Sequence, residues 1–283
     1  MFKIGRYNDL VVDSRVEFGL YLNSEQGRIL LPKKYVSESV KIGDTLKVFV
    51  YTDSEDRLVA TTLDPNGIVG DFVFLEAKDV TSFGTFMDWG LEKDLLVPKS
   101  EQLDRMVPGK KYLIKICFDD VTGRVYGTAK ISVNCDKDIT DLKEGQKVDL
   151  LIHTLTSIGI MAVVNNRYYG MLYTNETYKD LSSGDACTGY IMRLREDKKI
   201  DLTLKEPGYS SVQGSGDTIL NILNQAGGFI PCHDKSSPEE IKKIFSMSKK
   251  EFKRAVGSLY KKGFLELKEN GILLKQEIWP KKR

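Results

Sequence analysis

Short stretches in which apolar and polar residues alternate occupy the first two hundred positions of the chain. In the region 67–134, for example, FVFLEAKDV and KYLIKICFDD carry apolar residues at nearly every second position. Alternation of this kind, with many β-branched and aromatic residues, is typical of half-buried β-strands. The pattern predicts five strands, at 72–80, 82–90, 93–98, 111–120 and 124–130. Five short strands in about 70 residues fit a small barrel of the oligonucleotide/oligosaccharide-binding (OB) kind.

The same arrangement occurs three times, and regularly spaced glycines mark it. Gly5, Gly70 and Gly145 each precede a second glycine by fourteen residues, at Gly19, Gly84 and Gly159. A third glycine follows 24 or 25 residues later, and a basic residue opens the last strand of each copy. These later markers are Gly43, Gly109 and Gly184, then Arg57, Arg124 and Lys199. A register kept through three copies indicates tandem barrels at 1–66, 67–134 and 135–207. A glycine in the middle of a strand permits a bend or a close backbone approach.

The periodicity changes after a polar joint at 205–217. TILNILNQA has helical spacing and ends at Gly227-Gly228, and Ser237-Pro238 opens a second helix. Ser248 begins a third helix that ends at Gly263, and residues 264–275 read as a hairpin turning at Asn270-Gly271. This order predicts a winged helix at 214–283. The predicted fold class is therefore mainly β, with three tandem five-stranded OB-fold (S1-like) barrels followed by an α+β winged-helix domain.

Charge separates the two parts of the chain. The 283 residues have a net charge of +2, but residues 217–283 carry 14 Lys/Arg against 8 Asp/Glu, and the rest carries 28 against 32. A basic C-terminal segment favours a polyanionic partner, although a solvated surface gives the same composition. No apolar run is long enough for a signal peptide or membrane span, and the four cysteines have no CxxC spacing. We therefore expect a cytoplasmic protein with no membrane partner.

Aromatic residues around the second glycine are the first candidates for base contact. Phe83 and Phe86 flank Gly84, and Phe18 and Tyr21 hold the matching places in the first copy. Residues 83 and 86 would point to opposite faces of an undistorted strand, so a bend at the glycine is needed to bring both rings to one patch. Rings on such a patch would stack on bases, and nearby Lys99, Arg124 and Lys130 would follow the phosphates. The alternative is that one or both rings fill the barrel core.

The third copy and the winged helix supply further candidates. Ile158 and Met161 replace the aromatics in the third copy, while Tyr168 and Tyr173 lie on the next predicted strand, where they would either stack on bases or pack against a neighbouring domain. In the last helix, the predicted apolar stripe is Phe252, Ala255, Val256 and Leu259. The cations away from that stripe are Lys250, Lys253, Arg254 and Lys261. In a winged helix such residues contact nucleic acid, or they form a solvated face of a protein-interaction module.

The spacing G-x13-G, with an FG dipeptide, resembles the S1 RNA-binding repeat of a ribosomal small-subunit protein. In that family, two aromatics around the FG, a histidine on strand three, and an acid–base pair at the strand four–five turn contact RNA. The resemblance implies these roles for Phe83 with Phe86, for Phe18 with Tyr21, and for the basic residues Arg57, Arg124 and Lys199. Asp119 or Asp120 matches the acid. Pro32 and Pro98 stand in the place of the histidine, and Tyr173 takes it in the third copy.

The segment HDKSSPEEIKKIF followed by SKKEFKRAVGSLYKKG, behind three barrels, closely resembles the conserved virulence factor B family of bacteria. The likeness extends over essentially the whole chain. It implies an RNA-binding regulator of bacterial gene expression, without identifying the RNA.

Binding is favoured over catalysis. The only histidines are His153 and His233, and no GxSxG, HExxH, P-loop or GxGxxG motif is present. Asp119-Asp120 alone form a weak signal for Mg²⁺. We therefore predict no enzymatic activity, no cofactor and no metal site. The expected partner is single-stranded RNA, and the alternatives are duplex DNA bound through the winged helix and a protein bound to the barrels. The tail 276–283, with Trp279, would dock on a neighbouring domain or extend free.

Overall fold

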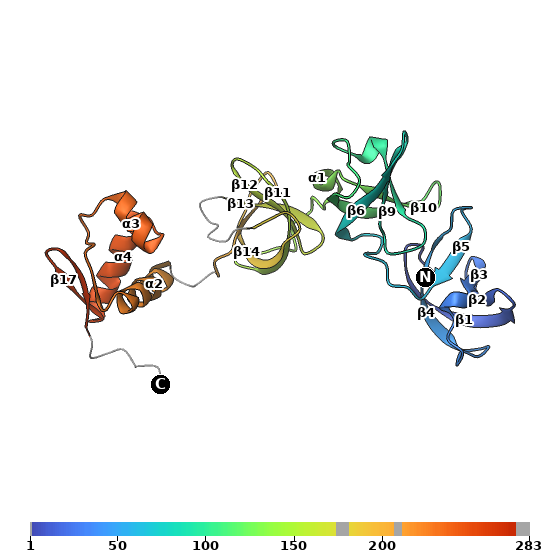
Figure 1. Cartoon of the computed structure of the whole chain (residues 1–283), viewed down its shortest axis with the longest axis horizontal. Coiled ribbons are helices and arrows are strands. Elements are labelled where there is room, and N and C mark those ends of the chain that lie inside the picture. Colours follow the sequence, from blue (N-terminus) through green and yellow to red (C-terminus); the bar gives the residue numbers. More distant parts are fainter. Residues whose placement is uncertain (1, 174–180, 207–210, 276–283) are drawn as a thin grey trace. The chain divides into compact units, whose positions relative to one another are not determined.

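The computed structural model of the chain describes residues 2–173, 181–206 and 211–275. The chain divides into two compact units, Met1–Leu204 and Lys205–Arg283. The predicted fold class is confirmed: the first unit consists of three five-stranded barrel sheets, and the second is a winged helix (Figure 1). The tail that contains Trp279 lies outside the described residues.

The first barrel is closed, with the strand order β1-β2-β3-β5-β4 (Figure 1). Its closure depends on one parallel pairing, Leu30 with Val59, whereas the other pairings are antiparallel. Alternate residues of its strands, such as Leu20 and Leu22, are buried in the barrel core. The strands are β1 (Arg6–Val16), β2 (Gly19–Ser24), β3 (Gly27–Pro32), β4 (Thr45–Thr52) and β5 (Leu58–Thr61), and a 3-10 turn, η1 (Lys33–Tyr35), follows β3.

The second and third repeats have the same topology. The third is a closed barrel, β11-β12-β13-β15-β14, while the second is a sheet of the order β10-β9-β6-β7-β8 without ladder pairing between β8 and β10. The strands of the second are β6 (Phe72–Val80), β7 (Gly84–Met87), β8 (Leu95–Pro98), β9 (Lys111–Asp119) and β10 (Arg124–Thr128), with a 3-10 turn, η2 (Lys99–Glu101). Those of the third are β11 (Lys147–Leu155), β12 (Gly159–Val164), β13 (Tyr168–Tyr173), β14 (Ala186–Leu194) and β15 (Ile200–Thr203).

The repeated glycines have a steric reason that does not involve a ligand. A Cβ at Gly84 would stand 2.5 Å from the carbonyl oxygen of Val97 on the neighbouring strand, and Gly19 and Gly159 face the same obstacle at 2.2 and 2.4 Å. The first marker has left-handed φ angles in all three repeats, for example 101° at Gly70, which favours glycine. The glycine register is therefore a property of the barrel itself.

Apolar junctions join neighbouring barrels in the first unit. Trp89 of the second barrel is buried, and its ring meets Phe49 and Tyr51 of the first barrel at centroid distances of 5.5 and 6.5 Å. Between the second and third barrels, Phe72 and Val163 belong to one buried cluster, together with Ile131 of the short helix α1 (Ile131–Asn134). Phe49 and Tyr51 of the first barrel thus extend the hydrophobic core of the second, while the first barrel keeps a core of its own.

The second unit is built on three helices and a small sheet of the order β16-β18-β17 (Figure 1). The predicted capping box at Ser237 and the cap at Ser248 are both present, and the apolar stripe Phe252, Ala255, Val256 and Leu259 is buried. The first helix starts earlier than expected, inside the segment predicted as a joint. The hairpin loop comprises residues 269–270, because Gly271 already begins a strand. The elements are α2 (Ser211–Gln225), β16 (Phe229–Ile230), α3 (Pro238–Phe245), α4 (Lys249–Lys261), β17 (Leu265–Lys268) and β18 (Gly271–Leu274).

Candidate nucleic-acid interface

Two pairs of aromatic rings lie at matching places on the first and second barrels. The rings of Phe83 and Phe86 meet edge to face at 5.8 Å and 86°, and those of Phe18 and Tyr21 at 6.3 Å and 88°. Phe83 is 57% exposed and Phe18 is 56% exposed, which is unusual for large apolar side chains at matching places of two domains. Each pair therefore presents an apolar edge to solvent on one face of its barrel.

The backbone around the glycine explains how residues three apart reach the same patch. Phe83 precedes β7 and lies in a turn that Thr81 closes. The Thr81 hydroxyl accepts a hydrogen bond from Gly84 N at 3.2 Å and donates one to Gly84 O at 2.9 Å. The ring of Phe83 is therefore not bound by the strand alternation that directs Phe86. Thr156 and Gly159 make the same two bonds in the third barrel, where exposed Ile158 stands in the place of Phe83.

The cations that were expected beside these rings have different surroundings. Lys99 is exposed directly after Pro98, and its amide donates to the carbonyl of Phe83 at 2.9 Å. Lys130 forms an ion pair with Glu101 at 3.4 Å. Within the described part of the chain, no acidic group lies within ion-pair distance of Lys99, so its ammonium group is available to an external anion.

Arg124 does not pair with the acid that its position suggested. Its guanidinium donates to both carboxylate oxygens of Asp56, which belongs to the first barrel, while the Asp119 carboxylate accepts from Thr122 Oγ1 at 2.6 Å. This bond to Arg124 lowers the pKa of the Asp56 carboxyl. The acid that pairs with Arg124 thus comes from the first barrel and is neither Asp119 nor Asp120, because the two barrels meet at this turn. The side chain of Asp120 is exposed and makes no hydrogen bond or ion pair with any residue that the structure describes.

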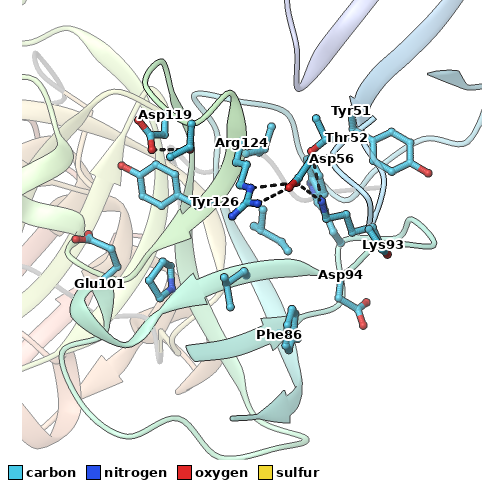
Figure 2. A pocket seen from close by; sticks show the side chains of 17 residues that line it. Tyr51, Thr52, Asp56, Phe86, Lys93, Asp94, Glu101, Asp119, Arg124 and Tyr126 are labelled. Atoms are coloured by element: carbon cyan, nitrogen blue, oxygen red, sulfur yellow. Dashed lines mark hydrogen bonds and ion pairs between the residues drawn. The ribbon is translucent and has the colours of Figure 1, made fainter. Parts of the chain in front are cut away.

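The pair lies in a cavity of about 500 Å³ between the first and second barrels (Figure 2). Phe86 and Pro98 of the second barrel line this cavity, as do Tyr126 and, from the first barrel, Thr52. Lys93 reaches into it from the segment before β8; its ammonium donates to the carbonyl of Asp53 at 2.7 Å and lies 3.9 Å from the Asp56 carboxylate. Burial lowers the pKa of Lys93. The face that carries Phe86 is thus partly covered by a turn of the neighbouring barrel.

The basic residues at the corresponding turns of the outer barrels pair locally. Arg57 bonds Asp53 at 2.7 Å and Glu55 at 2.9 Å, and Lys199 bonds Asp197 at 2.7 Å. All of these pairs are at the surface, where an ion pair contributes at most about 1 kcal/mol and exchanges readily for another anion.

The tyrosines of the third barrel require a correction. Tyr168 is only 2% exposed, lies in the barrel core and donates its hydroxyl proton to Asp141, so it is not available for stacking on a base. Tyr173 is half-buried; its hydroxyl accepts from Arg195 and donates to Asp201 at 3.3 Å, and the Arg195 guanidinium lies 6.0 Å from its ring centroid. Tyr169 packs at the junction with the second barrel, the alternative considered for this cluster.

The four cations of the winged helix are all exposed on α4. Lys253 lies 3.9 Å from Asp234, whereas no acid lies within ion-pair distance of the other three among the residues that the structure describes. Lys250, Arg254, Gly257 and Lys261 form one ridge along the helix, because successive members are four, three and four residues apart. A Cβ at Gly257 would have nothing within 4 Å, so packing inside the protein does not require a glycine there.

Three residues of this interface escaped sequence analysis. The junction of two barrels brings Lys93 and Asp56 to Arg124, and no sequence motif predicts that contact. Arg195 is placed over Tyr173 by the pairing of β14 with the rest of its sheet. The two arginines of its segment, RLRED, were a sequence signal for a cation at this place.

Fold and interface together define a class: tandem OB barrels with aromatic patches, joined to a winged helix with a basic helix face. Residues 4–63 match the model of the S1 domain, and residues 217–274 match that of the CvfB-like winged helix domain. Both domains point to nucleic acid as the partner of this chain.

Several relatives match this chain over most of its length. The protein YitL of Bacillus subtilis is 28% identical, with 94% of this chain and 92% of the relative covered. Conserved virulence factor B of Staphylococcus epidermidis is 25% identical, over 91% and 89%. A crystal structure from Streptococcus pneumoniae, described as a multidomain protein with nucleic acid binding domains, has 23% identity and a TM-score of 0.42, with 96% and 98% covered. The expected resemblance to conserved virulence factor B is thus confirmed.

Among the described residues, no helix has the length and apolar character needed to cross a membrane.

Proposed function

We propose that this chain is a non-catalytic, single-stranded RNA-binding protein of the bacterial cytoplasm that regulates gene expression after transcription. The observation that carries this proposal is the exposed edge-to-face ring pair at the same place on two successive barrels. An aromatic ring that is more than half exposed gains little from the fold of its own chain. It offers a flat apolar surface on which an unpaired base stacks.

Single-stranded RNA fits these patches better than a duplex does. Bases in a duplex are stacked on each other, whereas unpaired bases can be splayed out onto aromatic side chains. Lys99, whose amide bonds the carbonyl of Phe83, has no acidic partner among the described residues and supplies a positive charge for the adjoining phosphate. The basic ridge of α4 adds contacts to the sugar-phosphate backbone that do not depend on sequence.

The proposal is tested by replacing both rings of the second barrel. We expect Phe83→Ala with Phe86→Ala to weaken binding of labelled single-stranded RNA by about fivefold or more, since stacking contributes roughly 1–3 kcal/mol per base. Circular dichroism should show an intact fold because Phe83 is exposed. Ile158→Ala removes an exposed apolar side chain at the matching place of the third barrel and serves as the control. Unchanged RNA affinity in the double variant, or unfolding, would refute the stacking role.

Duplex DNA is a second candidate because Lys250, Arg254 and Lys261 are exposed on α4 without an acidic partner among the described residues. Titrating RNA and duplex DNA in parallel at several salt concentrations separates the two. If the duplex binds more tightly, and Lys250→Glu with Arg254→Glu alone abolishes that binding, the winged helix is a DNA reader. If neither nucleic acid binds at low salt, the barrels are a scaffold for protein partners.

The absence of catalysis is part of the proposal. The ring nitrogen Nδ1 of His153 lies 2.6 Å from the Tyr169 hydroxyl in a half-buried junction, and Nδ1 of His233 accepts from the amide of Lys235 at 3.1 Å. Both histidines thus have structural partners. We expect no degradation of RNA in Mg²⁺; cleavage that EDTA abolishes would contradict this.

A further inference from the structure

The junction of the first two barrels contains an anion site that the chain fills itself. Arg124 and Lys93 both belong to the second barrel, and both are directed at the one carboxylate of Asp56 from the first barrel (Figure 2). Arg124 engages both carboxylate oxygens with its Nε and a terminal nitrogen. This forked arrangement is the one by which arginine holds a carboxylate or a phosphate.

The position of the carboxylate relates this site to the ring patch. Phe86 and Arg124 line the same cavity, and Pro98, which pairs with Gly84 across the sheet, lies on its wall. A nucleotide whose base rests on Phe86 therefore places its phosphate within the reach of Arg124. In this structure the carboxylate of Asp56 already occupies the place of that phosphate at Arg124.

The turn that carries Asp56 holds this side chain at the surface, where it meets the second barrel. Asp56 has a φ of 60°, in the left-handed region that few residues other than glycine, asparagine and aspartate tolerate. Its amide donates to the carbonyl of Asp53 at 3.0 Å, and Lys93 holds the same carbonyl from the other barrel. The ion pair itself is open to water, with side chains 59% and 44% exposed, so an incoming anion can replace the carboxylate.

We propose that Asp56 stands in for an RNA phosphate at a composite site of Arg124 and Lys93, and that RNA binds across the second barrel by displacing it. This inference rests on the proposed function, and its ligand is the phosphate of a single-stranded polynucleotide. The first barrel thereby lowers the affinity of the second, and it selects for strands that can supply a phosphate where the carboxylate was.

Four proteins test this inference: the full chain, Asp56→Asn, Arg124→Gln and the double variant. Asparagine keeps the shape of the side chain and tolerates the left-handed φ, while it removes the charge. Binding of a labelled oligouridine of about 16 nucleotides is measured over a range of salt concentrations. Glu38→Gln is the control for net charge: it lies on the first barrel, is exposed, and makes no hydrogen bond or ion pair within the described residues.

We expect Asp56→Asn to tighten RNA binding by roughly two- to fivefold, the effect of freeing one exposed ion pair. The slope of log affinity against log salt should steepen by about 0.7, as for one additional phosphate contact. In the Arg124→Gln background the same substitution should give no gain. Glu38→Gln removes the same single negative charge at another place on the surface, so its gain in RNA affinity should be smaller than that of Asp56→Asn.

Each of the following results overturns the inference. Weaker binding of Asp56→Asn would mean that the carboxylate supports the site instead of blocking it. An equal gain in both backgrounds, or an equal gain for Glu38→Gln, would reduce the effect to net charge. Binding by all four proteins without any gain from Asp56→Asn refutes the displaced carboxylate alone, whereas absence of binding by all four refutes the proposed function as well.

Discussion

Gly257 offers a substitution for which stability and binding should change in opposite directions. Glycine inside a helix destabilises it by about 1 kcal/mol relative to alanine. Gly257 is in the interior of α4, has no left-handed φ, and would have nothing within 4 Å of an added Cβ. Gly257→Ala should therefore stabilise the unit Lys205–Arg283 by about 0.8–1 kcal/mol, which raises its melting temperature by roughly 4–8 °C.

The same methyl group should weaken nucleic-acid binding. Gly257 leaves a gap in the ridge of Lys250, Arg254 and Lys261, through which a sugar-phosphate backbone can approach the helix closely. Filling a tight contact costs about 1–3 kcal/mol, so we expect affinity to fall by about fivefold or more.

Thermal unfolding and RNA titration of the same preparation measure both effects. Asn221→Ala is the control: it also raises helix propensity in the same unit, at an exposed position in the interior of α2 and not on α4. A higher melting temperature with unchanged affinity would show that the gap has no part in binding. A lower melting temperature would refute the placement of Gly257 on an unobstructed helix face.

Two further predictions concern the third barrel. Tyr168→Ala should destabilise it by about 3–5 kcal/mol, measured as a lower urea midpoint, because the ring is buried; a stable variant with impaired RNA binding would contradict the core placement. Burial lowers the pKa of His153 below its ordinary 6.5, so as pH falls below that value the unfolded chain takes up the proton first and the folded state loses stability. His153→Gln should flatten the dependence of stability on pH between about 7.5 and 5.5, and an unchanged slope would show that another group causes it.

The features that sequence analysis predicted correctly are those that depend on neighbours along the chain. The strands of the second barrel appear where alternation predicted them, since side chains of a strand alternate between core and solvent. Ser237 and Ser248 cap their helices through bonds that span only three residues. The glycine register reflects a steric demand that recurs in every copy.

The features that sequence analysis missed depend on contacts between distant segments, or they lie in a strand where apolar and polar residues do not alternate. In β13, YYGMLY is apolar or aromatic at nearly every position, so the sequence does not show which phase faces the core; alternate residues starting with Tyr168 are buried. Asp56 and Arg124 are 68 residues apart and meet only because two barrels pack together. The basic face of α4 was predictable because the apolar stripe of the same helix was predictable, and the cations lie away from that stripe.

The placement of Trp89 has a consequence for dissecting the chain by truncation. Because this ring packs against Phe49 and Tyr51, an aromatic cluster crosses the boundary between the first two repeats, and we expect the two barrels to unfold together. A fragment that starts after the first barrel would expose a large indole surface and lose part of its own core. Amide protons of both barrels should accordingly exchange with solvent in one joint opening, and the share of each barrel in binding is better resolved by point substitutions than by deletion.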